Sequence, residues 1–222
     1  GGQPEFIVNK KKLIVGYSQN PVDDIDGNSY KTVKIGNQIW MAENLKVTHY
    51  QNGDPIPNIT NDDDWTGTQQ GAYCNYDNDE NNVETYGRLY NWFSVNDKRG
   101  LAPKGWHIPT DEEWKELVDF LGGGKVTGGK LKSTGTIQNG DGLWNTPNKE
   151  ATNESGFTGL PGGYRDTNNG NDNNMGPNGY FWSSTESNNN NAWYRILDYN
   201  NSEIYRTNYD KRDGFSVRCI RD

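Results

Sequence analysis

Apolar residues recur at helical spacing in the segment after Thr110. They stand at i, i+3, i+4 and i+7, and they are Trp114, Leu117, Val118 and Leu121. Thr110 and Glu113 have the spacing of a capping box, in which each side chain accepts a hydrogen bond from a free backbone N–H. The glycines at 122–124 end the pattern. The sequence therefore predicts a capped helix that reaches Leu121 and packs through its aromatic side.

Alternating apolar and polar residues predict short β-strands elsewhere. Tyr30–Met41 is expected to fold as a hairpin around the turn residues Gly36 and Asn37. A second hairpin is expected from residues 192–199 and 203–208. Further strands are predicted at 157–160, 180–185 and 214–220.

The run Tyr86–Phe93 is predicted as a buried helix of two or three turns beside the capped helix. Its apolar residues are Leu89, Tyr90, Trp92 and Phe93. Segments rich in asparagine and glycine separate the predicted elements, and such residues favour turns and loops. The pattern as a whole indicates an α+β fold with little helix and with long ordered loops between strands.

The composition changes this picture only through its aromatic residues. Hydrophobic residues make up 31% of the chain and the mean hydropathy is -1.06, values that are typical of disordered proteins. Eight Trp and thirteen Tyr nevertheless provide large side chains for a core. We therefore expect one folded domain over residues 23–222, preceded by a linker or an extra strand over residues 1–22.

The net charge of -8 argues against nucleic acid and anionic membranes as partners. The sequence contains no apolar run near 18 residues, so no transmembrane segment is predicted. It begins like a mature or trimmed chain, and the missing signal peptide therefore says nothing about its precursor.

Two cysteines, Cys74 and Cys219, leave two alternatives open. A disulfide between them would close a loop of about 145 residues and would stabilise the fold by roughly 5 kcal/mol in the chain-entropy model. The other alternative is a pair of buried free thiols, because two cysteines match neither a metal site nor a disulfide-rich scaffold.

Candidate catalytic groups are few. His107 stands at the start of the capped helix, where a structural hydrogen bond is expected rather than catalysis, and His49 belongs to no motif. Ser183–Glu186 offers hydroxyl groups without a nucleophile elbow or a nearby histidine in sequence. The sequence therefore predicts a protein that is not an enzyme.

Two loops rich in side-chain oxygens are candidate calcium sites. Calcium is the cofactor that these loops favour, because it binds six to eight oxygen ligands. Neither loop has the spacing of an EF-hand, and such residues also bond to their own turns. The candidate ligands are Asp77, Asp79, Asn81, Asp166 and Asp172.

Aromatic residues beside the polar loops of the C-terminal half predict a glycan-binding surface. Aromatic rings stack on sugar faces, and neighbouring polar groups bond the hydroxyls. The alternative for each indole ring is a place in the core. The candidate ligand-binding residues are Tyr164, Arg165, Tyr180, Trp182, Trp193, Tyr194 and Tyr205.

Eight ordered runs resemble one family, the Fibrobacter succinogenes major paralogous domain. The resemblance extends from about residue 24 to the C-terminus. The runs are Asp26–Gly36, Trp40–Leu45, Tyr86–Trp92, Gly105–Thr110, Asn153–Phe157, Leu160–Arg165, Phe181–Glu186 and Gly214–Cys219.

The resemblance implies a fold similar to C-type lectins and to the formylglycine-generating enzyme (sulfatase-modifying factor) group, with short strands and long loops around two main helices. It also implies a secreted or lipid-anchored protein at the outer surface of a Gram-negative bacterium of the Bacteroidetes or Fibrobacter type. Formylglycine-generating enzymes use a cysteine pair near their C-terminal end, whereas this chain has only Cys219 there. Relatives often carry Cys-Pro where this chain has Ala102-Pro103, so a disulfide of the relatives is expected to be absent or re-partnered.

These observations predict a non-catalytic extracellular module for binding or adhesion, with a glycan or a surface protein as its ligand. Two alternatives remain. One is a diverged enzyme of the formylglycine-generating group, which would need a pocket that gathers a cysteine or histidine with a second titratable group. The other is a structural surface or pilus-associated domain, for which a large exposed apolar patch would be typical.

Overall fold

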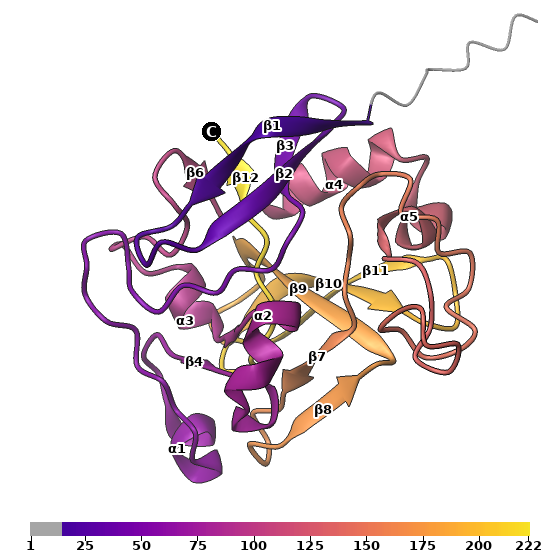
Figure 1. Cartoon of the computed structure of the whole chain (residues 1–222). Helices are drawn as coiled ribbons and strands as arrows, with labels where there is room; N and C mark the ends of the chain where they lie inside the picture. Colours follow the sequence, from indigo (N-terminus) through magenta and orange to yellow (C-terminus); the bar gives the residue numbers. More distant parts are fainter. Residues whose placement is uncertain (1–14) are drawn as a thin grey trace, which may run out of the picture.

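Two five-stranded sheets form the framework of residues 15–222, the part of the chain that this computed structural model describes (Figure 1). The first sheet has the order β1-β2-β3-β12-β6 and the second the order β11-β10-β9-β7-β8, while β4 and β5 pair separately. The strands are β1 (Val15–Asp23), β2 (Ser29–Ile35), β3 (Gln38–Met41), β4 (Tyr73–Cys74), β5 (Leu89–Tyr90), β6 (Trp106–His107), β7 (Gly162–Arg165), β8 (Asp172–Met175), β9 (Asn178–Glu186), β10 (Asn191–Asp198), β11 (Ile204–Asp210) and β12 (Ile220–Arg221).

The helices are short and lie at the margins of the sheets. Figure 1 places α4 and α5 together on one side of the molecule, and α1, α2 and α3 on the other. They are α1 (Asp62–Gly67), α2 (Val83–Tyr86), α3 (Trp92–Val95), α4 (Asp111–Phe120) and α5 (Gly124–Leu131), with two 3₁₀ turns, η1 (Tyr76–Asn78) and η2 (Glu80–Asn82). The predicted mixed α+β class is confirmed.

The predicted hairpin at Tyr30–Met41 is confirmed. Strands β2 and β3 pair with Ile35 opposite Gln38, which leaves Gly36 and Asn37 as the two-residue turn. Gly36 has a φ of 62°, a left-handed conformation that glycine adopts without strain. Strand β1 pairs with β2 at the edge of this sheet and contains residues 15–22 of the predicted linker or extra strand. Residues 1–14 of that segment lie outside the described residues.

The capped helix is confirmed as α4. Thr110 accepts a hydrogen bond from the backbone of Glu113, and Glu113 accepts one in return from the backbone of Thr110. Trp114 and Leu117 are fully buried, as the apolar spacing predicts. The glycines after Leu121 separate two helices, because Gly122 and Gly123 have positive φ values and α5 begins at Gly124. This second helix was not predicted.

The prediction of one helix over Tyr86–Phe93 is wrong. Helix α2 ends at Tyr86, Gly87 has a φ of 74°, and the chain then forms β5 before α3 begins at Trp92. A side chain at Gly87 would collide with Asn44 and with the carbonyl of Leu45. The helix is broken because the backbone must pass close to these residues.

The predictions for the C-terminal strands have mixed outcomes. The hairpin of β10 and β11 and the strand at 180–185, which lies within β9, are confirmed. The segment 157–160 is not a strand and contributes only an isolated bridge at Gly159, because Thr158 has a φ of 55°. In the segment 214–220, regular pairing is limited to Ile220, while Phe215 and Ser216 form isolated bridges.

Tryptophan side chains join distant segments of the chain within the core by hydrogen bonds. The indole of Trp182 donates to the carbonyl of Tyr90 at 2.8 Å, and that of Trp92 donates to the carbonyl of Ser183 at 2.9 Å. Both rings are buried beside Phe215 in one cluster. These two buried indoles thus satisfy their N–H groups.

The two cysteines are buried free thiols, in agreement with the second alternative and not with the disulfide. They belong to different clusters, Cys74 with Trp65 and Cys219 with Tyr30. Burial raises the pKa of Cys74 to about 12 and also raises that of Cys219. Both thiols are therefore protonated at neutral pH and are poor nucleophiles.

Buried cations are bound by backbone carbonyl groups. The ammonium of Lys132 donates to the carbonyls of Lys149, Asp198 and Asn201 at 3.0, 2.8 and 2.8 Å. Burial lowers the pKa of Lys132 to about 8, although Asp198 and Glu150 oppose the shift. Lys132 thus fastens the loop after α5 to the turn between β10 and β11.

Replacement of Lys132 by Met is expected to lower the free energy of unfolding by about 3 kcal/mol, because three buried carbonyls lose their donor. Urea denaturation followed by tryptophan fluorescence measures the change. Lys125→Met, at an exposed lysine of α5, is the matched control and should leave stability unchanged. Equal stability of the two variants would contradict the role given to Lys132.

His107 connects the start of α4 to the C-terminal strand. Its Nδ1 lies 2.6 Å from a carboxylate oxygen of Asp222, and its Nε2 lies 2.8 Å from one of Glu113. Burial alone would lower the pKa of His107, but these hydrogen bonds and the two negative charges raise it above its ordinary value. The histidine therefore has the structural role that the sequence predicts.

His107 is expected to titrate above the ordinary histidine pKa of about 6.5. Its contribution to stability is complete below that value and is lost as the pH rises through the raised pKa, because the folded state binds the proton more tightly. An NMR titration measures this directly, since the chain has two histidines. Asp222→Asn should lower the pKa of His107, because one of the two carboxylates beside the ring loses its charge. A His107 pKa below 6.5 in the unmodified protein would refute the prediction.

Candidate functional site

Five tyrosines lie on one face of the second sheet, and we call this surface the tyrosine face. The register explains their common side, because directly paired residues of neighbouring strands point to the same face. On β10, Ile196 is opposite both Tyr180 of β9 and Tyr205 of β11. The tyrosine face consists of Tyr164, Tyr180, Tyr194, Tyr205 and Tyr209.

The inner part of the tyrosine face is closely packed. The ring centroids of Tyr164 and Tyr180 are 4.8 Å apart, and those of Tyr180 and Tyr194 are 6.2 Å apart. Phe215 supports this group, with its ring centroid 5.3 Å from that of Tyr180. Tyr180 and Tyr194 are buried, whereas Tyr164 is half-buried at the surface.

The outer part of the face is exposed on the edge strand β11. Tyr205 and Tyr209 are 41% and 45% exposed, and they are the exposed aromatic residues among those whose burial is described. The hydroxyl of Tyr205 accepts a hydrogen bond from the amide of Asn201 at 3.0 Å. Two rings four residues apart on a strand are separated by about 13 Å along it.

Acidic residues surround the inner tyrosines. Burial raises the pKa of Tyr164 to about 12, and the negative charge of Asp166 adds to this effect. Asp213 is fully buried, and one of its carboxylate oxygens lacks a hydrogen-bond partner among residues 15–222. Burial raises the pKa of Asp213 to about 8 against the hydrogen bond from the Thr167 N–H, and nearby Asp166 and Asp210 add to the rise. The face is therefore aromatic and bordered by acids.

Five of the seven predicted ligand-binding residues lie on one side of the second sheet, and the other two do not. Trp182 is fully buried, and Tyr180 and Tyr194 are buried as well, so the expectation of exposed rings is wrong for these three. Trp193 points to the opposite face of β10, where the guanidinium of Arg206 lies 3.4 Å from its ring centroid. Arg165 is also fully buried and forms an ion pair with Asp62 at 2.7 Å. Trp182, Trp193 and Arg165 thus form contacts within the fold.

The predicted calcium ligands do not converge. The backbone N–H of Asp77 donates to a carboxylate oxygen of Asp172 at 2.8 Å, which brings the two loops into contact. Asp79 and Asp166 instead accept hydrogen bonds within their own turns. Within the described chain, His, Cys, Asp and Glu residues do not gather in groups of three or more that could hold a metal ion.

A second surface was missed by the sequence reasoning. It is formed by two neighbouring hollows of about 570 and 300 Å³ that share Lys46 and Glu84, and we call it the motif groove. Four of the runs that carry the family resemblance contribute to its lining, for example through Asp26, Glu43 and Arg88. The sequence gives no local signal for Lys46 and Glu84, because only the folded chain brings them together.

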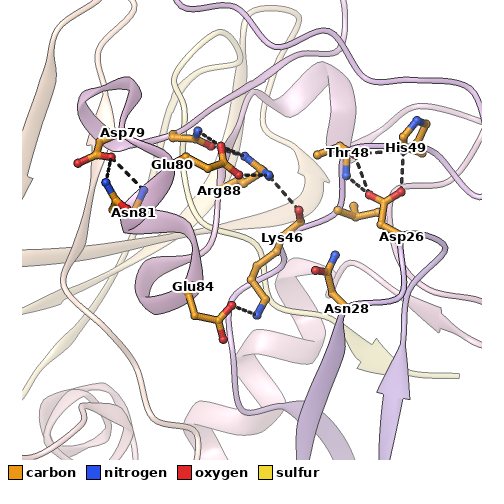
Figure 2. Close-up of polar contacts among 12 residues, drawn as sticks. Asp26, Asn28, Lys46, Thr48, His49, Asp79, Glu80, Asn81, Glu84 and Arg88 are labelled. Atoms are coloured by element: carbon orange, nitrogen blue, oxygen red, sulfur yellow. Dashed lines mark hydrogen bonds and ion pairs between the residues drawn. The ribbon is translucent and has the colours of Figure 1, made fainter.

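Figure 2 shows polar contacts in and beside this groove. The ammonium of Lys46 lies 3.1 Å from a carboxylate oxygen of Glu84, and the guanidinium of Arg88 lies 2.8 Å from one of Glu80. Arg88 also donates to the carbonyl of Lys46 at 2.9 Å. The loop that carries Lys46 is thereby fixed beside the strand that follows Arg88.

His49 and Asp26 form another of these contacts. Nδ1 of His49 lies 2.6 Å from Oδ1 of Asp26 (Figure 2). The other carboxylate oxygen, Oδ2, accepts hydrogen bonds from the backbone N–H and the hydroxyl of Thr48. Burial tends to raise the pKa of Asp26, but these bonds lower it overall. In a catalytic triad the hydroxyl nucleophile and the orienting carboxylate lie on opposite nitrogens of the histidine ring. Here the hydroxyl of Thr48 and the carboxylate of Asp26 both face Nδ1 of His49, so the three groups do not form such a triad.

Comparison with known proteins yields one family. The sequence pattern described as the Fibrobacter succinogenes major domain matches residues 33–221. Neither a curated protein nor a solved structure matches the chain. A search of residues 15–222 found no helix whose length and apolar character would allow it to span a membrane.

Asp213→Asn is expected to change how stability depends on pH. The folded state holds the Asp213 proton up to about pH 8 while the unfolded chain releases it near pH 4, so stability falls between these values. Asparagine does not titrate, so the variant should gain on the order of 4 kcal/mol over the unmodified protein between pH 5 and pH 8.5. Urea unfolding at both pH values measures the gain. Parallel pH profiles for the two proteins would refute a buried acid at this position.

Proposed function

The chain belongs to the Fibrobacter succinogenes major domain family, and we propose that it is a non-catalytic extracellular module that binds a glycan through the tyrosine face. The observation that carries the proposal is the position of the exposed aromatic residues. Among the aromatic side chains whose burial is described, Tyr205 and Tyr209 are the exposed ones, and both extend the same face. Exposed rings on a rigid sheet are suited to stacking on the apolar faces of sugars.

The arrangement favours an extended polysaccharide over a single sugar. The two exposed rings are about 13 Å apart along β11, a distance longer than one sugar ring. Tyr164 and the buried tyrosines hold the intervening surface rigid, so little ordering is needed when a ligand binds. The negative charges of Asp166 and Asp210 at the border of the face disfavour a polyanionic chain at this position.

The finer predictions from the family resemblance are part of the same proposal. We infer a lectin-like and sulfatase-modifying-factor-like arrangement from the short strands, long loops and few helices. We also infer a secreted or lipid-anchored protein at the outer surface of a Gram-negative bacterium. Calcium is the proposed cofactor of the Asp77 and Asp172 loops, which are in contact. A glycan or a glycosylated surface protein is the proposed partner.

Non-catalytic action is supported by the state of the thiols. Cys74 and Cys219 are fully buried and have raised pKa values, so neither is suited to the chemistry of the formylglycine-generating group. The carboxylate of Asp26 and the hydroxyl of Thr48 both lie at hydrogen-bond distance from Nδ1 of His49. The hydroxyl is therefore not in the position of a nucleophile that the histidine would activate. Binding is therefore the function that the residues support best.

Substitution of Tyr205 and Tyr209 by alanine is expected to weaken polysaccharide binding by about tenfold for each ring, because each loses a stacking contact. Affinity electrophoresis with soluble β-glucan, xylan and mannan, with and without calcium, measures the effect. Ile137→Ala removes an exposed apolar residue elsewhere and is the matched control. Binding that is equal in all variants, or absent for every polysaccharide, would refute the proposal.

A further inference from the structure

We propose that the motif groove is a second binding site, specific for a carboxylate on a small hydroxylated ligand such as a sugar acid. Lys46 is the residue that would bind the carboxylate. The site is separate from the tyrosine face, and the inference does not depend on the function proposed for that face.

The first step of the argument is the state of the Lys46 ammonium. The side chain is only 12% exposed, and its ammonium lies 5.8 Å from the centroid of the Tyr30 ring. Within residues 15–222, Glu84 is the one side chain or carbonyl that accepts a hydrogen bond from this ammonium. An ammonium has three donors, so two remain available on the groove side.

The second step is the contrast between the two partners of this ion pair. Lys46 is held in place because its backbone N–H donates to the hydroxyl of Tyr30 and its carbonyl accepts from Arg88. Glu84 lies on the short helix α2 and is 90% exposed. An ion pair with so exposed a carboxylate contributes little free energy, so a ligand can displace Glu84 without loss of structure.

The third step concerns the kind of anion. The groove already accommodates a carboxylate, that of Glu84, at hydrogen-bond distance from the ammonium. A ligand carboxylate would replace it with the same charge and similar geometry. The charge of Arg88 is already balanced by Glu80, so the cations that a ligand carboxylate can meet in the groove are Lys46 and the exposed Lys31.

The rest of the lining fits a hydroxylated ring. The larger hollow has a volume of about 570 Å³, within the range of about 300–1,000 Å³ that is usual for small-molecule sites. Glu43 and Thr85 offer polar groups for hydroxyls, while Leu143 and Leu160 offer apolar contact for a ring face. A sugar acid carries both kinds of surface together with the carboxylate.

The test measures binding of glucuronate by isothermal titration, with glucose and sulfate as comparison probes. Lys46→Met should weaken glucuronate binding by at least about tenfold, because the charge-assisted contact is lost. Glu84→Gln should strengthen it by about two- to fivefold, because the competing carboxylate is removed. Binding to the unmodified protein should also weaken at high salt.

Two matched controls accompany these variants. Lys115 and Asp119 form an exposed ion pair on α4, so Lys115→Met and Asp119→Asn repeat both charge changes away from the groove. Neither should alter glucuronate affinity, and Tyr205→Ala should leave it unchanged as well. The last control separates this site from the tyrosine face.

Three outcomes would overturn the inference. The first is the absence of glucuronate binding to both the unmodified protein and Glu84→Gln, whose exposed position leaves folding intact. The second is glucose or sulfate binding as tightly as glucuronate. The third is a Glu84→Gln variant that binds glucuronate no more tightly than the unmodified protein, since displacement of Glu84 is the basis of the proposal.

Discussion

A fully buried guanidinium, that of Arg218, joins three segments that are far apart in the sequence. It donates to the side chain of Asn44 at 2.6 Å, to the carbonyl of Met41 at 3.0 Å and to those of Phe157 and Thr158 at 2.5 and 2.8 Å. Burial lowers its pKa to about 9, so it remains charged at neutral pH. Because a buried cation must be surrounded by acceptors, these segments are constrained to meet around it. Asn44 and Thr158, which also line the larger hollow of the motif groove, are held in place by these contacts.

Local patterns were sufficient to predict the elements that depend on neighbouring residues. The capping pair at the start of α4 and the turn at Gly36 are such cases, because their hydrogen bonds close within a few residues. The run Tyr86–Phe93 could not be predicted in this way. Its residues form the end of one helix, then a strand, and then the start of another helix. The break at Gly87 results from the close approach of Asn44 and Leu45, more than forty residues earlier in the sequence. Tertiary contact overrides local periodicity at that point.

The candidate sites also differ in how far local sequence could predict them. Aromatic composition indicated the tyrosine face, but only the register separates Tyr205, which is exposed, from Trp182, which lies on the same side and is buried. Arg165 is predicted as a ligand-binding residue, but it pairs with Asp62, a partner about a hundred residues away that no local pattern indicates. The motif groove could not be found from the sequence, since Lys46 and Glu84 belong to different segments and meet only after folding.

The segment that carries Arg218 also joins parts of the fold that are far apart in the sequence. Phe215 bridges to Tyr90, Ser216 to Phe181, and Ile220 pairs with both Trp40 and His107, so residues 215–220 contact both sheets. Contacts of such long sequence separation make folding slow. Refolding is therefore expected to be slow for a domain of this size, because its core closes only when this segment is in place.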